Sequence, residues 1–247
     1  MSRLPPRPAL VWGEDGAPRA EIFDDVYFSR AGGLEESRAV FLEGCALPAR
    51  WQGQASHRLC ELGFGAGLNA LATWALWART RAPGARLDYV AIEAFPLVRA
   101  EAARALAQFS PLGGYADRLL ARWPVRAYGP QRLWFPEDGF ALTLIVGEVS
   151  GALDGLTGQF ESWFLDGFAP ARNPAMWSEA VARRIAALSA PGAHAASYSV
   201  AGAVRRALAA AGFAVEKRPG FAAKRERLEA RLSAPPPQPQ ALYAYAG

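Results

Sequence analysis

The most informative stretch of this chain is Leu59-Cys60-Glu61-Leu62-Gly63-Phe64-Gly65-Ala66-Gly67-Leu68-Asn69. A short apolar run ends in an acid, and three glycines then follow at alternate positions. Residues 68–80 place apolar side chains at helical spacing, which predicts a helix directly after the glycines. Strand, glycine turn and helix form the first unit of nucleotide-handling α/β folds, where glycine lets a ligand approach the backbone and tolerates a positive φ. The stretch therefore predicts a ligand at this turn.

The composition is that of a globular enzyme-sized chain. Of its 247 residues 51% are hydrophobic and 20% charged, which excludes global disorder. No apolar run approaches the roughly 18 residues of a membrane span, and the first residues lack the apolar stretch of a signal peptide. Cys45 and Cys60 form neither a metal-like spacing nor a disulfide framework, so we expect a cytoplasmic protein without a metal. The net charge of +4 permits a polyanionic partner.

Strand and helix patterns alternate along the rest of the chain, which predicts an α/β fold with a doubly wound, mostly parallel sheet. A small inserted hairpin is expected at residues 132–146, around the turn Pro136-Glu137-Asp138-Gly139. Residues 225–232 fit a last strand or a short helix. We expect a loose N-terminal arm over residues 1–20, one domain over 21–232, and a Pro-rich flexible tail or linker over 233–247.

Four predicted strands end in acids, namely Glu61, Glu93, Glu148 and Asp166. The carboxyl ends of parallel strands share one edge of a sheet, so these carboxylates would repel one another without a compensating ligand or donors. A single ligand with hydroxyls, an amine and a positive charge explains all four together. Glu93, at the end of the second strand, is placed to bind ribose hydroxyls.

Two ligand classes fit this pattern, a dinucleotide and S-adenosylmethionine. Residues 63–67 read G-x-G-x-G, without the G-x-G-x-x-G spacing that places a pyrophosphate on the helix N-terminus. S-adenosylmethionine has no phosphate, and its sulfonium suits surrounding carboxylates. We therefore favour S-adenosylmethionine and keep a nicotinamide-dependent oxidoreductase as a remote alternative.

Four further motifs carry a resemblance to one family. They are Asp25-Val26-Tyr27-Phe28-Ser29, Gly33-Leu34-Glu35-Glu36, the run from Trp163-Phe164-Leu165-Asp166-Gly167-Phe168-Ala169-Pro170 through Ala171-Arg172-Asn173-Pro174-Ala175-Met176-Trp177, and Lys217-Arg218-Pro219-Gly220-Phe221 with Lys224-Arg225-Glu226. Together with the glycine turn, these resemble the methyltransferase domain that completes 5-methylaminomethyl-2-thiouridine at the tRNA wobble position, the MnmC/MnmD type. The resemblance covers residues 24–232. The chain departs from the common pattern of class I methyltransferases at Glu148, where they usually carry aspartate.

The resemblance implies a Rossmann-like class I methyltransferase with antiparallel C-terminal strands. The implied reaction transfers a methyl group from S-adenosylmethionine to the primary amine of 5-aminomethyl-2-thiouridine in the tRNA anticodon stem-loop. No FAD is expected in this chain, although many family members continue into a flavin-dependent oxidase domain, which is an expected partner, separate or formerly fused. An S-adenosylmethionine-dependent methyltransferase acting on a small-molecule or protein amine is the alternative, and a catalytically silent RNA-binding module is a weaker one.

The resemblance also assigns roles to residues. Asp166 is the expected catalytic residue: because an aspartate in water has a pKa near ~3.9, it would orient the amine and stabilise the developing ammonium and would not act as a strong base. The expected cofactor-binding residues are Glu61, Gly63, Phe64, Gly65, Gly67, Asn69, Glu93, Glu148 and Asp166. The expected substrate-binding residues are Tyr27, Phe28, Glu35, Phe168, Pro170, Arg172, Asn173, Lys217, Arg218, Lys224 and Arg225, with Arg205 and Arg206 as further phosphate candidates. His57 and His194 are interpreted as structural.

Overall fold

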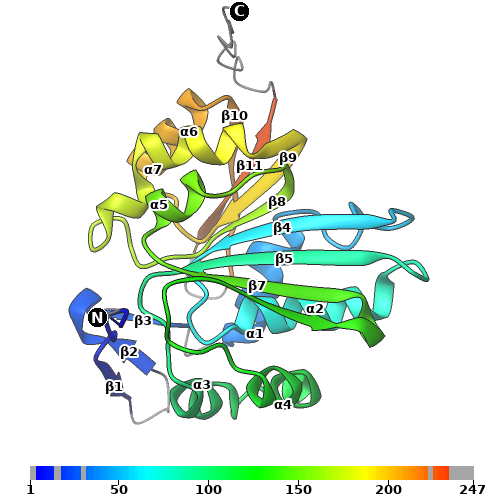
Figure 1. Ribbon diagram of the computed structural model, residues 1–247. Helices are drawn as coiled ribbons and strands as arrows, with labels where there is room; N and C mark the ends of the chain where they lie inside the picture. The colour runs from blue at the N-terminus through cyan, green and yellow to red at the C-terminus, as the bar shows by residue number, and fades with distance from the viewer. Residues whose placement is uncertain (1–3, 14–17, 29–31, 222–224, 234–247) are drawn as a thin grey trace, which may run out of the picture.

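A computed structural model describes residues 4–13, 18–28, 32–221 and 225–233. Its centre is an eight-stranded sheet in the order β10-β11-β9-β8-β4-β5-β7-β6 (Figure 1). The strands span Ser56–Leu62 (β4), Arg86–Glu93 (β5), Gly129–Phe135 (β6), Phe140–Val146 (β7), Phe160–Leu165 (β8), Ser189–Ser197 (β9), Phe213–Pro219 (β10) and Glu226–Leu232 (β11).

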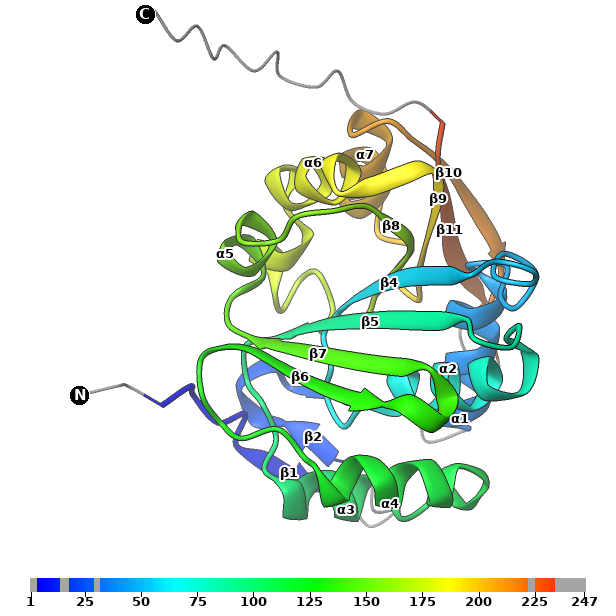
Figure 2. The same cartoon turned by 45° about the vertical axis from the view of Figure 1, so that its right-hand side comes forward.

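The central strands are parallel, because β4 pairs with β5 and β8, β5 with β7, and β8 with β9 in parallel register. Antiparallel pairs close both edges, β6 with β7 on one side and β11 with β9 and β10 on the other. The mostly parallel sheet and the antiparallel C-terminal strands are thus confirmed. The predicted hairpin is present, and it forms one edge of the main sheet (Figure 2).

Helices cover both faces of the sheet (Figure 1). One side carries α1, η2, α2, α3 and α4, and the other carries α5, α6 and α7. Their bounds are Gly33–Ser37 (α1), Arg38–Glu43 (the π-helix η2), Leu68–Thr80 (α2), Arg99–Leu106 (α3), Gly113–Ala121 (α4), Val149–Asp154 (α5), Glu179–Ala187 (α6) and Gly202–Ala210 (α7), with short 3-10 turns at Glu21–Phe23 (η1), Ser110–Leu112 (η3), Pro136–Asp138 (η4) and Pro174–Trp177 (η5).

The two faces build separate hydrophobic cores. Alternate residues of a strand point to opposite faces, so Leu59 joins the core under α2 while Cys60 joins the core under α6 and α7. In β8, Phe164 faces the first core and Trp163 the second. Because the inner strands are buried on both faces, they read as continuous apolar runs, as in other parallel sheets.

The prediction of a loose N-terminal arm over residues 1–20 is wrong for those of its residues that the structure describes. Leu10–Trp12 (β1), Pro18–Ala20 (β2) and Asp25–Val26 (β3) pair as a small antiparallel sheet, which lies beside α3 (Figure 2). The Arg104 guanidinium of α3 lies 4.1 Å from the centre of the Trp12 ring. Strands of two or three residues give almost no periodic signal, so this sheet could not be predicted from the pattern. The expected tail lies outside the described residues, apart from Ser233.

Candidate active site

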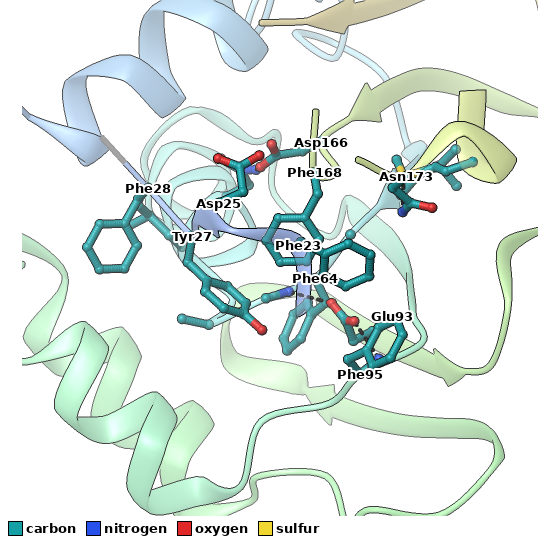
Figure 3. Close-up of a pocket in the computed structure, with 18 of the residues that line it drawn as sticks. Phe23, Asp25, Tyr27, Phe28, Phe64, Glu93, Phe95, Asp166, Phe168 and Asn173 are labelled. Atoms are coloured by element: carbon teal, nitrogen blue, oxygen red, sulfur yellow. Dashed lines mark hydrogen bonds between the residues drawn. The ribbon is translucent and has the colours of Figure 1, made fainter. Parts of the chain in front are cut away.

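A cavity of about 690 Å³ opens at the carboxyl ends of β4, β5 and β8. The chain runs from β4 outward to β5 and β7, then returns to β8 and β9 on the other side, so the cavity lies where the strand order reverses. Ligands of open α/β sheets bind in this position. Phe23, Asp25, Tyr27, Phe64, Glu93, Phe95, Asp166, Phe168 and Asn173 surround the cavity in Figure 3.

Residues 63–66 of the glycine turn line the cavity. Gly63, Gly65 and Gly67 have φ values of 95°, 52° and 81°. An added Cβ at Gly63 would lie 1.7 Å from the backbone oxygen of Asp166, and one at Gly65 would lie 2.9 Å from the Tyr27 ring. The prediction of positive φ is confirmed. The glycines also let the loop after β8 and the Tyr27 ring pack directly against this turn, which the sequence did not reveal.

Asn69, in the first turn of α2, connects two of the strand-end acids. Its Nδ2 donates to Glu61 Oε1 at 2.8 Å and to Asp166 Oδ2 at 2.5 Å, while its Oδ1 accepts from the Ser37 hydroxyl at 2.5 Å. Tyr89 donates to the second oxygen of Glu61 at 2.8 Å. The Asn69 side-chain amide therefore orients the carboxylates of Glu61 and Asp166.

Glu61 is the one strand-end acid that does not line the cavity. Its side chain is 1% exposed, and burial, followed by the nearby charge of Asp166, raises its pKa well above the usual value. Its two oxygens accept from Asn69 and Tyr89. The structure therefore keeps Glu61, an expected cofactor-binding residue, out of the cavity lining, and Glu61 contacts Asn69, which does line the cavity.

Glu93 lines the cavity and is held by two backbone N–H groups. Gly65 N donates to Oε2 at 2.9 Å and Phe95 N to Oε1 at 2.7 Å. Burial raises the pKa of Glu93, and these N–H donors oppose the shift. The carboxylate thus ties the glycine turn to the end of β5 and stays at the cavity wall.

Glu93, Glu148 and Asp166 share this one cavity, as the strand-end pattern predicted. Glu148 is exposed and immediately precedes α5, whereas Asp166 is half-buried and follows β8. Asp166 N donates to Leu62 O at 3.0 Å, which continues the β4–β8 pairing up to the glycine turn. Three of the four acids therefore line the same cavity. The fourth, Glu61, is connected to Asp166 through hydrogen bonds from Asn69.

Aromatic rings form another wall. Phe168 stacks on Phe23 with centroids 4.3 Å apart and an interplanar angle of 20°, and Tyr27 meets Phe168 edge-on at 5.5 Å. Phe23 also meets Phe95 edge-on at 5.1 Å. The Tyr27 hydroxyl is buried at the cavity without a hydrogen-bond partner, and burial raises its pKa.

The predicted substrate residues divide into two groups. Tyr27, Phe28, Phe168 and Asn173 line the cavity. The others do not: Pro170 and Arg172 follow in the loop after β8, Glu35 is exposed on α1, Arg205 and Arg206 lie on α7, Lys217 and Arg218 lie on β10, and Arg225 is exposed just before β11. Lys224 lies outside the described residues.

Several of these basic residues already have acidic partners. Arg172 donates to Asp24 Oδ2 at 2.7 Å and to Phe23 O at 3.2 Å, which fixes the segment that carries the aromatic wall. Lys217 Nζ lies 2.9 Å from a Glu226 oxygen, and Arg218 lies 2.6 Å from Glu216. Arg172 is therefore a brace for the wall.

The pattern missed several cavity residues, above all Asp25, Glu36 and Tyr198. Asp25 and Glu36 belong to two of the motifs that carry the family resemblance, and this membership is the signal that could have identified them. Tyr198 stands in no motif, and only its position after β9 brings it to the cavity. His57 is buried with Nε2 3.0 Å from the Ser162 hydroxyl, consistent with the predicted structural role.

No group of three or more His, Cys, Asp or Glu side chains suited to a metal ion occurs within the described ranges. Over the same ranges, no helix is long and apolar enough to cross a membrane.

Comparisons with known proteins agree with this geometry. Residues 110–233 match the model of a family described as S-adenosyl-L-methionine-dependent methyltransferase. The bifunctional protein MnmC for tRNA 5-methylaminomethyl-2-thiouridine biosynthesis from Maricaulis maris is 56% identical over 90% of this chain, and its Caulobacter sp. counterpart is 50% identical over 96%. This chain spans 38% and 41% of those two relatives.

Among solved structures, MnmC2 from Aquifex aeolicus superposes with a TM-score of 0.72 at 22% identity, covering 95% of this chain and 72% of that one. This likeness supports the fold. The family match covers half of the chain and includes β8 with Asp166 and the loop that follows it. The chain belongs to the S-adenosyl-L-methionine-dependent methyltransferases.

Proposed function

We propose that this chain transfers a methyl group from S-adenosylmethionine to the primary amine of 5-aminomethyl-2-thiouridine at the tRNA wobble position, giving 5-methylaminomethyl-2-thiouridine. The observation that carries the proposal is the 56% and 50% identity, over nearly the whole chain, to proteins named for the biosynthesis of that nucleoside. The cavity chemistry supports it independently.

The cavity fits S-adenosylmethionine in size and charge. Its volume of about 690 Å³ lies within the usual range of ~300–1,000 Å³ for small-molecule sites. The lining residues that the structure describes include Asp25, Glu36, Glu93, Glu148 and Asp166, and none of them is Lys, Arg or His. Such a wall suits a ligand that carries a sulfonium and an ammonium, and it repels a pyrophosphate.

Residues of this chain would hold the cofactor from two sides. The turn from Gly63 to Gly67 would receive it along the backbone, and Glu93 would accept hydrogen bonds from ribose hydroxyls. Glu148 would contact the cofactor at the end of β7. Bound S-adenosylmethionine would supply an electrophilic methyl group on its sulfonium.

Asp166 would hold the accepting amine. As the N–C bond forms, positive charge builds up on nitrogen, and a carboxylate fixed next to it stabilises that charge. Asn69 supports this role because its 2.5 Å hydrogen bond fixes one Asp166 oxygen. The amine loses its extra proton to water before it attacks, and alignment of the bound reactants supplies much of the acceleration.

The base would enter beside the aromatic wall of Phe23, Tyr27 and Phe168. Since one face of Phe168 stacks on Phe23, the uracil would use the opposite face or the ring edges. Stacking of an extruded base on an aromatic ring is worth roughly 1–3 kcal/mol.

The backbone of the stem-loop would contact the end of the β10–β11 hairpin. Phe221, after β10, lies against Gly32, where an added Cβ would be 3.7 Å from its ring, and the next residue, Gly33, lines the cavity. Lys217, Arg218 and Arg225 flank this end of the hairpin and would bind phosphates. A flavin-dependent oxidase, fused or separate, would generate the amine.

Mass spectrometry of wobble nucleosides tests the proposal after the protein and S-adenosylmethionine have been incubated with tRNA bearing the aminomethyl group. We expect a mass gain of one methyl group on that nucleoside, and we expect Asp166→Ala to abolish it while cofactor binding weakens only modestly. Calorimetry with S-adenosylmethionine and with NAD provides the control. Tight binding of NAD alone, or methylation of free small amines with the tRNA left unmodified, would contradict the proposal.

A further inference from the structure

The acidic end of the cavity contains more than Asp166. Asp25, Glu36 and Asp166 all line the cavity, and Tyr198 lies close enough for all three charges to act on its phenol. Burial and then these charges raise the pKa of Tyr198. The three carboxylates therefore face a common space, although they come from β3, α1 and the end of β8.

Hydrogen bonds from two backbone N–H groups fix the Asp25 carboxylate at the cavity wall. Its Oδ1 accepts from Val26 N at 2.9 Å, and its Oδ2 accepts from Ala169 N at 3.0 Å, in the loop that carries Asp166. The second contact joins segments 144 residues apart. In the view of Figure 3, the Asp25 and Asp166 carboxylates lie together on one side of the Phe23 and Phe168 rings, and Glu93 lies on the other.

Two fixed carboxylates beside one cavity favour a cation between them, because each stabilises the charged form of a group within about 4–6 Å. Each Asp25 oxygen accepts a hydrogen bond from one backbone N–H, whereas a carboxylate oxygen can accept two. Asp25 can therefore receive a second set of donors without losing the contacts that hold the wall.

We propose that Asp25 is a second carboxylate of the substrate-amine site and that it selects a base bearing an ammonium group over its neutral isostere. The inference rests on the proposed function and deepens it. A primary alkylamine is mostly protonated near neutral pH and reaches the cavity as a cation. Asp25 and Asp166 bind that cation together, and Asp166 remains beside the nitrogen after its proton has left.

Asp25→Asn tests the role, because asparagine keeps the shape and one acceptor oxygen while it removes the charge. Asp24→Asn is the matched control: Asp24 is exposed, pairs with Arg19 and Arg172, and does not line the cavity. The control weakens the ion pairs that hold the same segment on its solvent-exposed side. Binding is measured for two anticodon stem-loops that differ only in carrying a 5-aminomethyl or a 5-hydroxymethyl wobble base, with S-adenosylhomocysteine present.

We expect the wild type and Asp24→Asn to prefer the aminomethyl RNA, and Asp25→Asn to lose that preference by roughly tenfold, the effect of about one charge-assisted contact. Binding of S-adenosylhomocysteine should stay within about twofold. An unchanged preference refutes the inference, and so does an equal loss for both RNAs, which indicates a structural role. Weakened S-adenosylhomocysteine binding with the preference intact would assign Asp25 to the cofactor. In a separate incubation with S-adenosylmethionine, an aminomethyl RNA left unmethylated by the wild type would show that the proposed function itself fails.

Discussion

Asn69→Ala should uncouple the two acids that meet at the glycine turn. The change removes the hydrogen bonds to Glu61 and Asp166 and the bond from Ser37. Glu61 is almost fully buried and would keep Tyr89 as its donor. A buried polar group left without its partner costs roughly 1–3 kcal/mol, so we expect a loss of about 2–4 kcal/mol in the free energy of unfolding.

Turnover should fall further than stability alone explains. Without Asn69, the Asp166 carboxylate loses one donor that orients it, and misplacement of a reacting group by about 1 Å can cost roughly 100-fold in rate. Tyr89→Phe is the matched control, since it removes the other donor to Glu61 and leaves the Asn69–Asp166 contact intact. We expect it to lose about 1–2 kcal/mol of stability and to keep turnover within about twofold.

The pH dependence gives a second readout. The pKa of Glu61 is already raised in the folded protein above its usual 4.5, so the folded state holds this proton more tightly than the unfolded state does. Stability from this group therefore falls as pH rises above about 4.5. The Asn69 hydrogen bond opposes the rise in the pKa of Glu61, so its loss raises that pKa further and extends the fall to higher pH. Urea denaturation at pH 5 and pH 8 should show the smaller Asn69→Ala deficit at pH 5. Normal turnover in Asn69→Ala, or an equal loss in Tyr89→Phe, would refute the coupling.

Two further predictions concern packing and titration. Gly63→Ala should lower the free energy of unfolding by more than about 3 kcal/mol, because φ is +95° and the new Cβ would clash with the Asp166 carbonyl oxygen. Gly114→Ala is the control, because the new Cβ would enter open space beside α4. Equal melting temperatures for the two variants would contradict this prediction. Burial lowers the pKa of His57 to about 4 from 6.5, so the folded protein keeps this ring neutral and loses stability as pH falls below 6.5. Between pH 7.5 and pH 5, the free energy of unfolding should fall by about 2 kcal/mol because of His57. Urea denaturation of His57→Gln at both pH values should show a smaller fall than the wild type does. An equal fall in both proteins would assign the acid sensitivity to other groups.

Local patterns predicted the framework well. The glycine turn, the helix at Leu68–Thr80 and the strand at Phe140–Val146 all lie where the sequence placed them, because strand and helix periodicities are local properties of the chain. Positive φ at the three glycines also followed from residue type. The ambiguous last segment became β11, because its pairing with β9 and β10 decided what its short pattern could not.

The sequence by itself determined which residues end the strands and which glycine turn follows β4 at the cavity, since both depend on neighbours along the chain. Only the tertiary structure decided that Glu61 stays out of the cavity lining, that Asn69 joins it to Asp166, 97 residues further along the chain, and that Asp25 of the N-terminal sheet lines the same cavity. The physical reason is strand order: β8 inserts beside β4, and no periodicity along the chain records which strands will be neighbours.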